Sequence, residues 1–262
     1  MKLPYWQVDA FVDGPLSGNP AAVLLLDHPI EDGAMQAVAA ETGLPATAFV
    51  LPGENDIRPI RWFASDREIA LCGHGALAAG HLVLAGADRD EARFRSASGE
   101  LLTVRRLARQ AAYELGLPAL VSESHAIDGL AEALGREPVE MLWRDGGYAV
   151  AVFADAADVL ALAPEASALR ALGNWQVTAT APGTGEDVVS RVFSSGGRED
   201  AATGSAHALL TPYWTARLGR SSFTARQASA RGAKFDCRIE GATVWLGGAC
   251  RTVIEGSYCP AG

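Results

Sequence analysis

The chain has 262 residues, of which 49% are hydrophobic and 20% are charged, and its formal net charge is -9 at pH 7. This composition supports a globular core, in one large domain or in two of ordinary size. The acidic balance argues against nucleic acid and anionic membranes as partners, because both attract clustered Lys and Arg. We therefore expect no nucleic-acid partner and no membrane partner.

The expected location is the cytoplasm, because polar residues such as Gln7 and Asp9 come too early for the apolar core of a signal peptide. No uncharged apolar run is long enough to predict a membrane helix. The four cysteines are spaced without a CxxC pair, which favours reduced thiols over disulfides or a zinc site. No metal and no cofactor are predicted.

Short strand-like segments dominate the first part of the chain. They are rich in aromatic and β-branched residues and are bounded by Pro, Gly, Asp and Asn; they cover residues 5–12, 21–27, 46–52 and 57–64. Two helices are predicted between them, over residues 31–42 and 74–85, and each is followed by a glycine that favours a helix end. The second helix is apolar nearly all round, so a sheet is expected to surround it.

The same kind of pattern continues in the rest of the chain. Residues 97–120 predict a hairpin followed by a Gly/Pro break, and residues 204–219 predict a second buried helix. Pro212 lies inside that helix, where a kink or a short break is expected. The further predicted strands cover residues 175–183, 188–195, 222–227, 234–240 and 243–256.

Two stretches of the sequence are similar to each other. "LCGHGALAAGHL" and "AATGSAHALL" both place a small glycine-containing loop directly before a buried helix. This weak internal repeat predicts two similar domains, each with a sheet around one helix. The expected boundary lies near Pro118, which gives domains 1–117 and 118–262, with the last strand free to return to the N-terminal domain.

Both helix starts have the features of an anion site. The backbone N–H groups of a first helical turn lack partners within the helix, and glycines allow a carboxylate to approach them closely. The two starts are Gly73-His74-Gly75 and Gly204-Ser205-Ala206. If they face one cleft, a small anionic metabolite fits there; the alternative is that the glycines only permit tight turns.

Four side chains near these starts are candidates for chemistry. Cys72 precedes a helix, where a thiolate is favoured, although free cysteines are also often simply buried. His74 is a candidate general acid or base. Of Glu199 and Asp200, which precede the second helix, either could simply cap the helix, and Asp200 is the better candidate base. His81 and His207 lie in apolar helical runs and are interpreted as packing residues.

Four stretches together resemble the PhzF-like (phenazine biosynthesis-like) family of the diaminopimelate epimerase superfamily. They are "VDAFVDGPLSGNPAAVLLLD", "RWFASDREIALCGHGALAAGHLVL", "VFSSGGREDAATGSAHALLTPYW" and "TARQASARGAKFDCRIEG". The resemblance implies an α+β fold of two pseudo-symmetric domains. Each is a highly curved, mostly antiparallel sheet wrapped around a central helix, with the active site between the domains. It also implies cofactor-free acid–base isomerisation and a homodimer.

The resemblance also implies roles for individual residues. Catalytic roles fall to His74, Asp200 and Cys72, and substrate contacts fall to Asn19, Gly73, Gly75, Gly204 and Ser205. In epimerase relatives a cysteine stands in a place like that of Cys72 and a second one faces it. This chain has Ala202-Thr203-Gly204 in the second loop, so a two-cysteine racemase is not expected.

The chain departs from the family at the residue that carries the proton. The segment "ETGLPATAFV" places Ala46 where the family has its catalytic glutamate, and Glu41 lies five residues earlier. Ala70 similarly stands where many relatives have an aspartate. Since general acid–base catalysis contributes roughly 10²–10⁴-fold, the standard proton transfer should be nearly lost unless another group replaces the glutamate.

Three hypotheses remain. The first is an isomerase of a small carboxylate-bearing metabolite with a non-standard proton carrier. The second is a catalytically inactive protein that binds a ligand or a partner. In the third, Cys72 is a covalent nucleophile.

Overall fold

The computed structural model describes residues 2–109, 111–194 and 196–259. Contacts within it divide the chain into two compact units. Unit 1 consists of Met1–Leu117 and Gly247–Gly262, and unit 2 consists of Pro118–Leu246. Within the described ranges, every helix is too short or too polar to cross a membrane.

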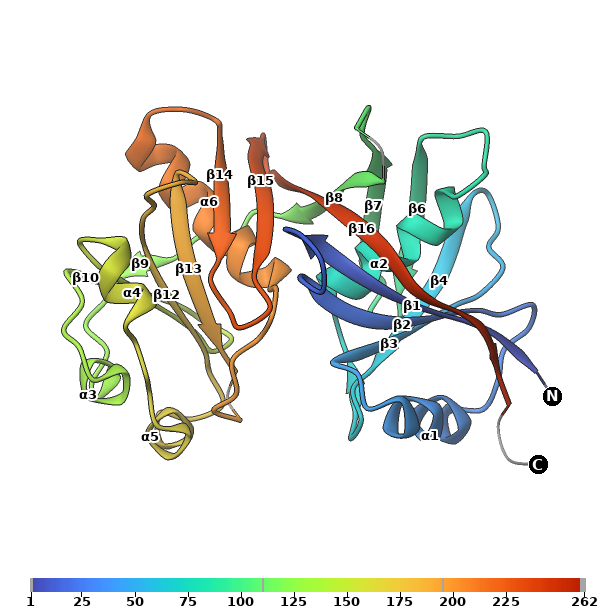
Figure 1. Ribbon diagram of the computed structural model, residues 1–262, viewed down its shortest axis with the longest axis horizontal. Coiled ribbons are helices and arrows are strands. Elements are labelled where there is room, and N and C mark those ends of the chain that lie inside the picture. The colour runs from blue at the N-terminus through green and yellow to red at the C-terminus, as the bar shows by residue number, and fades with distance from the viewer. Residues whose placement is uncertain (1, 110, 195, 260–262) are drawn as a thin grey trace. The chain divides into compact units, whose positions relative to one another are not determined.

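Unit 1 is a strand-rich unit around one central helix (Figure 1). Its elements are β1 (Leu3–Val12), β2 (Asn19–Leu25), α1 (Asp32–Thr42), β3 (Ala46–Val50), β4 (Ile57–Phe63), β5 (Glu68–Ile69), α2 (Gly73–Leu84), β6 (Glu91–Ser96), β7 (Leu101–Arg106) and β8 (Ala112–Pro118). The strand order is β1-β2-β3-β4-β6-β7-β8, and β16 (Thr243–Tyr258) pairs with both β8 and β1. This double pairing closes the curved sheet, because the last strand returns to the first.

Unit 2 repeats this plan. Its elements are β9 (Glu123–Ser124), α3 (Leu130–Leu134), β10 (Glu140–Arg144), β11 (Tyr148–Val152), α4 (Ala156–Leu160), α5 (Ala166–Ala171), β12 (Gln176–Pro182), β13 (Val188–Phe193), α6 (Gly204–Leu218), β14 (Ser222–Gln227) and β15 (Ala233–Glu240). The strand order runs β9-β10-β11-β12-β13-β14-β15 and then to the start of β16. Most neighbouring strands in both units are antiparallel, as expected.

The parallel pairs reveal the repeat most clearly. In unit 1, β2 pairs with β3 and β4 pairs with β6; in unit 2, β11 pairs with β12 and β13 pairs with β14. Parallel neighbours need a crossover connection, which is usually helical. The connections are α1 and α2 in unit 1, and α4 with α5, followed by α6, in unit 2. Helices α2 and α6 therefore hold equivalent places.

Helix α2 is the centre of unit 1. It contacts β1, β2, β3, β6 and β7, which confirms that a sheet surrounds it. One close approach occurs at Gly80, where an added Cβ would lie 2.4 Å from Cγ1 of Val104 on β7. A glycine at this point lets the helix and the strand approach closely. The predicted limits of α1 and α2 are correct to within one residue.

Helix α6 runs from Gly204 to Leu218 without a break at Pro212, so of the two expected outcomes the break is excluded and the kink stays a prediction. Proline has no N–H to donate to the carbonyl four residues earlier. That carbonyl belongs to Ala208, and it accepts a hydrogen bond of 3.2 Å from the backbone N–H of Leu120. Another segment of unit 2 therefore supplies the donor that the proline lacks, and the helix continues.

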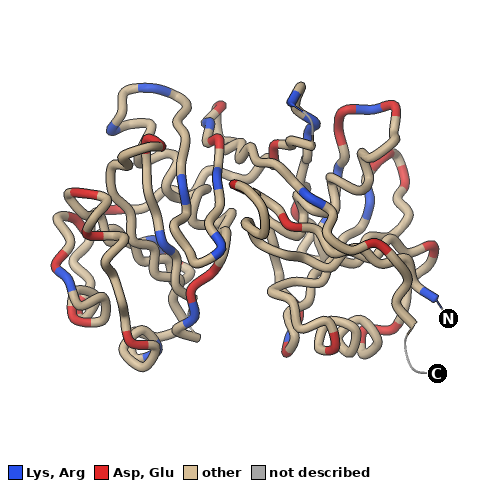
Figure 2. The backbone as a smooth tube through the Cα atoms, in the orientation of Figure 1, with Lys and Arg blue, Asp and Glu red and all other residues tan. Residues whose placement is uncertain are grey.

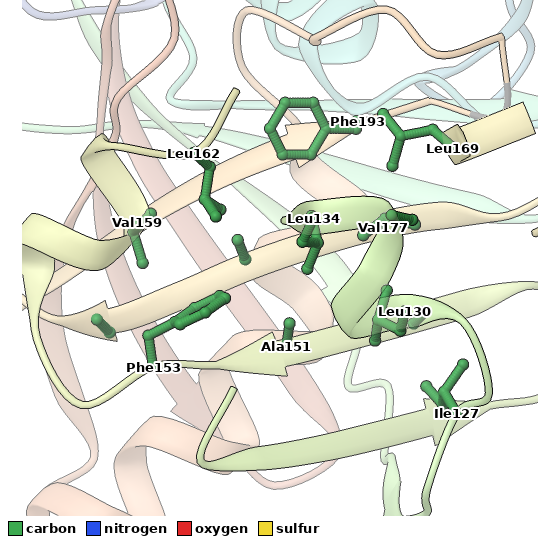
Figure 3. Packing of buried hydrophobic residues seen from close by; sticks show 14 of the residues in the cluster. Ile127, Leu130, Leu134, Ala151, Phe153, Val159, Leu162, Leu169, Val177 and Phe193 are labelled. Atoms are coloured by element: carbon green, nitrogen blue, oxygen red, sulfur yellow. The ribbon is translucent and has the colours of Figure 1, made fainter. Parts of the chain in front are cut away.

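The outer face of the unit 2 sheet carries a second layer of short helices (Figure 3). Val177 on β12 and Phe193 on β13 pack there with Leu134, Val159 and Leu169 from α3, α4 and α5. The sequence pattern did not predict these three helices or strands β5, β6, β9, β10 and β11. Two predicted positions, Gln110 in the hairpin and Ser195 at the end of a strand, lie outside the described residues.

The cysteines are all free thiols, as predicted. Cys72, Cys237 and Cys250 are buried, and Cys259 is exposed. Charged residues of both signs are spread over each unit (Figure 2).

Candidate functional site

The start of α2 is the first candidate site, and Cys72 is its N-cap residue. Its backbone is extended, with φ -134° and ψ 99°, and its side chain does not cap the helix. The first helical hydrogen bond runs from the N–H of Ala76 to the carbonyl of Cys72, at 2.9 Å. The amides of Gly73 and Gly75 belong to the turn before it, where a helix has no internal acceptors. This end of α2 therefore favours an anion.

Three predicted site residues meet at this helix start. The Sγ atom of Cys72 lies 3.5 Å from Nδ1 and 3.8 Å from Nε2 of His74, and Nδ2 of Asn19 lies 3.4 Å from the same Nδ1. The exposed fractions are 5% for Cys72, 8% for His74 and 0% for Asn19. An amide NH₂ group can only donate, so the contact with Asn19 favours a lone pair on Nδ1 and a proton on Nε2. A cysteine and a histidine side chain thus lie next to a helix N-terminus.

Gly75 also has a packing role. A Cβ at this position would lie 2.8 Å from Cδ1 of Trp62 and 3.0 Å from Sγ of Cys72. The indole of Trp62 is 1% exposed, and its buried Nε1 has no hydrogen-bond partner among the described residues. Sequence reasoning did not single out Trp62, because nothing in a strand pattern shows that an indole N–H faces a helix start.

The structure shows the surroundings of Ala46 and Ala70, the two positions at which the family pattern has a carboxylate. Ala46 is the first residue of β3 and is fully buried, while Glu41 is exposed on α1. Ala70 is exposed, two residues before Cys72. An alanine methyl group has no titratable proton, so any acid–base proton transfer in unit 1 must use other groups.

The start of α6 is the second candidate site, and Asp200 is fixed beside it. Oδ1 of Asp200 accepts from the N–H of Ala201 at 2.9 Å, and Oδ2 accepts from the hydroxyl of Thr203 at 2.5 Å. Gln227 holds both neighbours, since its Nε2 donates to the Asp200 carbonyl at 2.7 Å and its Oε1 accepts from the Thr203 N–H at 2.9 Å. Thr203 is the N-cap residue, but its hydroxyl does not cap α6.

Glu199 has a structural role that matches one in unit 1. Its carboxylate accepts two hydrogen bonds from Arg191, at 2.7 and 3.0 Å, and the Arg191 guanidinium lies over the ring of Phe193. In unit 1, Arg61 makes the same fork to Glu68 and lies over Phe63. Each glutamate lies four residues before the N-cap of the central helix. These ion pairs anchor the loops that lead into both helix starts.

The other two helix histidines are packed inside the units, and Nδ1 of His207 lies 2.9 Å from the carbonyl oxygen of Thr203, the N-cap residue of α6. His207 is fully buried and stacks on Phe235 with ring centroids 3.7 Å apart. Burial lowers the pKa of His207 to about 4, so it is neutral at physiological pH. His81 bonds Tyr113 and Thr252 through its two ring nitrogens, and burial lowers its pKa as well. Both are packing residues, as predicted.

The two sites hold few metal-binding side chains. Across the described part of the chain, no group of three or more His, Cys, Asp or Glu side chains could hold a metal ion.

Comparison with known proteins gives the family. Residues 8–256 match the model of the phenazine biosynthesis-like proteins. Two Pseudomonas aeruginosa proteins named as uncharacterised isomerases are 40% and 42% identical, over 98% of this chain and 99% and 98% of theirs. A crystal structure of a PhzF family protein from Enterococcus faecalis has a TM-score of 0.90 at 35% identity and covers 99% of this chain and 100% of that one. The expected epimerase-like fold is therefore confirmed, and the chain belongs to the phenazine biosynthesis-like (PhzF) family.

Proposed function

We propose that the protein is a cofactor-independent isomerase of a small carboxylate-bearing metabolite, with a proton carrier other than the usual glutamate. The observation that carries the proposal is the cluster of Cys72, His74 and Asn19 at the start of α2. It combines titratable groups with a helix N-terminus suited to a carboxylate. The similarity to two proteins named as isomerases supports the same class of reaction.

In this proposal, His74 and Asp200 move the proton and Cys72 is a reserve base. A general base must lie within hydrogen-bond reach of the proton it removes. We propose that both helix starts act on one substrate molecule bound between the two units. The amides of Gly73 and Gly75 at one start, and of Gly204 and Ser205 at the other, then bind its anionic oxygens.

A second candidate function is binding without catalysis. It draws on Ala46 and Ala70, the two positions at which carboxylates of the family pattern are absent. In this case the helix starts hold a ligand or a partner, and no C–H bond of the ligand is broken.

Solvent deuterium separates the two functions. The protein is incubated in D₂O with a set of amino and hydroxy carboxylates, and deuterium beside the carboxylate is followed by proton NMR. Incorporation that is lost in His74→Ala and Asp200→Asn supports the isomerase. His28→Ala and Asp66→Asn replace exposed residues of the same types and should keep the wild-type rate. Exchange that persists in both site variants would exclude the proposed proton carriers, and no exchange with any compound would favour binding alone.

A gain-of-function variant tests the scaffold. Ala46→Glu returns a carboxylate to the start of β3, which is fully buried. If the rest of the site is intact, this variant should exchange deuterium faster than the wild type. No increase, in a variant that still folds, would show that the divergence extends beyond one residue.

We also propose that the protein is a cytoplasmic homodimer without a nucleic-acid or membrane partner. The net charge of -9 supports the absence of such partners, and residues of both signs are spread over each unit (Figure 2). Sedimentation equilibrium measures the oligomeric state, and a monomer at micromolar concentration would contradict the dimer.

A further inference from the structure

We infer that Gln176 is a specificity residue of unit 2, whose amide N–H binds an acceptor oxygen of the ligand at the start of α6. This inference deepens the proposed function and rests on it in one respect, namely that the start of α6 binds a substrate carboxylate. The observations behind it come from β12, α6 and the hydrogen bonds between them.

One face of β12 is directed toward α6. Val177, Ala179 and Ala181 belong to the hydrophobic cluster on the opposite face, where Figure 3 shows Val177 beside Leu134. Since side chains alternate along a strand, Gln176, Thr178 and Thr180 share the other face.

Two hydrogen bonds show how this face meets α6. Ser205, in the first turn of the helix, donates to Oε1 of Gln176 at 2.8 Å. Trp214, farther along the helix, donates to Oγ1 of Thr180 at 3.1 Å. Strand and helix therefore run side by side, and Gln176 lies at the helix start.

Some polar side-chain atoms on this face of β12 have hydrogen-bond partners and others do not. The hydroxyl of Thr180 both accepts from Trp214 and donates to the carbonyl of Val189, at 2.9 Å. Nε2 of Gln176 and Oγ1 of Thr178 are buried and have no hydrogen-bond partner among the described residues. Thr178 as a whole is 0% exposed. Buried polar groups are nearly always hydrogen-bonded, so this pair indicates a place for a further hydrogen-bonding atom.

The donors at this place define the chemistry of the occupant. The side-chain amide nitrogen of Gln176 can only donate hydrogen bonds, and the backbone N–H groups of a first helical turn are also donors. The two terminal atoms of an amide are about 2.3 Å apart, so Nε2 of Gln176 lies within about 5 Å of the Ser205 hydroxyl. An acceptor oxygen with negative charge suits this set, whereas an ammonium group does not.

The repeat shows that this amide is particular to unit 2. Val177 pairs with Phe193 as Thr47 pairs with Phe63, so Gln176 occupies the place that Ala46 has in unit 1. Unit 1 instead has the buried and unpartnered Nε1 of Trp62, next to Gly75 at the start of α2. Each unit thus adds one side-chain N–H donor to its helix start, from a different strand.

Acetate is the simplest probe of this site. In the full-length protein, sodium acetate is titrated against sodium chloride of equal ionic strength, and ¹H–¹⁵N spectra follow the Gln176 side-chain amide and the backbone amides of Gly204 and Ser205. We expect these signals to shift along one saturation curve. Gln176→Met should weaken acetate binding at the helix start about tenfold or more, since the lost hydrogen bond is to a charged group.

Two further variants make the test sharper. Gln176→Glu places a negative charge beside the acetate and should weaken binding more than Gln176→Met does. Gln36→Met makes the same change to a half-buried glutamine of unit 1 whose Nε2 donates to the Ala64 carbonyl, and it should leave binding at α6 unchanged. The dispersion of the spectrum reports whether each variant folds.

The inference fails if Gln176→Met binds acetate as the wild type does, if Gln176→Glu binds it more tightly, or if the Gln176 signal never responds. Failure of the proposed function looks different. In that case acetate binds as expected, but no carboxylate exchanges deuterium.

Discussion

The replacement Gly80→Ala tests how α2 is packed in unit 1. An alanine Cβ at this position would lie 2.4 Å from Cγ1, 2.6 Å from Cβ and 2.9 Å from Cγ2 of Val104, which is fully buried on β7. Carbon atoms in contact are normally about 3.5–4.0 Å apart. All three contacts would therefore be too short, and the β-branched side chain has little rotational freedom to relieve them.

Two opposing terms set the size of the effect. Alanine favours a helix over glycine by about 1 kcal/mol, while overpacking a core costs about 1–3 kcal/mol and sometimes more. Because three atoms of Val104 are involved, we expect Gly80→Ala to lower the free energy of unfolding by about 1–2 kcal/mol. The double variant with Val104→Ala should lose at least about 1 kcal/mol less than the sum of the two single variants.

Urea unfolding followed by tryptophan fluorescence measures these differences. Gly33→Ala is the matched control, because Gly33 lies in α1 and nothing lies within 4 Å of an added Cβ there. It should stabilise the protein by about 0.5–1 kcal/mol. If Gly80→Ala were as stable as Gly33→Ala, close packing between α2 and β7 would not be what requires a glycine.

Three further predictions concern the helix starts and the buried groups. Arg191→Lys replaces the two hydrogen bonds to Glu199 with at most one, so it should lower the free energy of unfolding in urea by about 1–3 kcal/mol. The control Arg93→Lys, in an exposed pair, should change it by less than about 0.5 kcal/mol. His207 has a folded pKa of about 4, below its unfolded value of roughly 6.5. The unfolded state therefore binds more protons between these values, and stability should fall by up to about 3 kcal/mol as pH drops from 6.5 to 4; His207→Asn should have a shallower pH slope over this window, and an unchanged slope would contradict the assignment. With iodoacetamide at neutral pH, exposed Cys259 should react first, followed by Cys72 at the start of α2. If mass spectrometry found Cys237 and Cys250 labelled before Cys72, the Cys72 thiol would not be activated.

The sequence alone predicted the elements with strong local signals. Helix α1 ends where Gly43 adopts the left-handed conformation, with φ 62°, and glycine is the residue best suited to it. Strands β4, β13 and β14, which neighbour α2 or α6 in the chain, have aromatic and β-branched residues, so their position was predictable. Helices α3, α4 and α5 have only five or six residues each, which is too short for a periodic pattern, and packing on the sheet stabilises them instead.

The candidate site shows the same division. The glycine loops before α2 and α6 were recognisable as candidate anion sites, because each lies directly before a buried helix, although the sequence left open that the glycines only permit tight turns. The sequence also showed that Ala46 replaces the glutamate of the family pattern. It did not reveal Trp62, Gln176 or Gln227. Each of these residues lies on a strand, and its separation from the helix start along the chain does not show whether the two are in contact.

What the sequence determined is therefore local: which residues form helices and strands, where a helix presents its free amides, and that four motifs occur in the order of one family. The tertiary structure decided which groups lie next to those amides. Only the folded sheet places a Trp62 N–H and a Gln176 N–H, both buried and without a partner in the described chain, at the two helix starts. Burial makes such groups matter energetically, and burial depends on contacts between residues far apart in sequence.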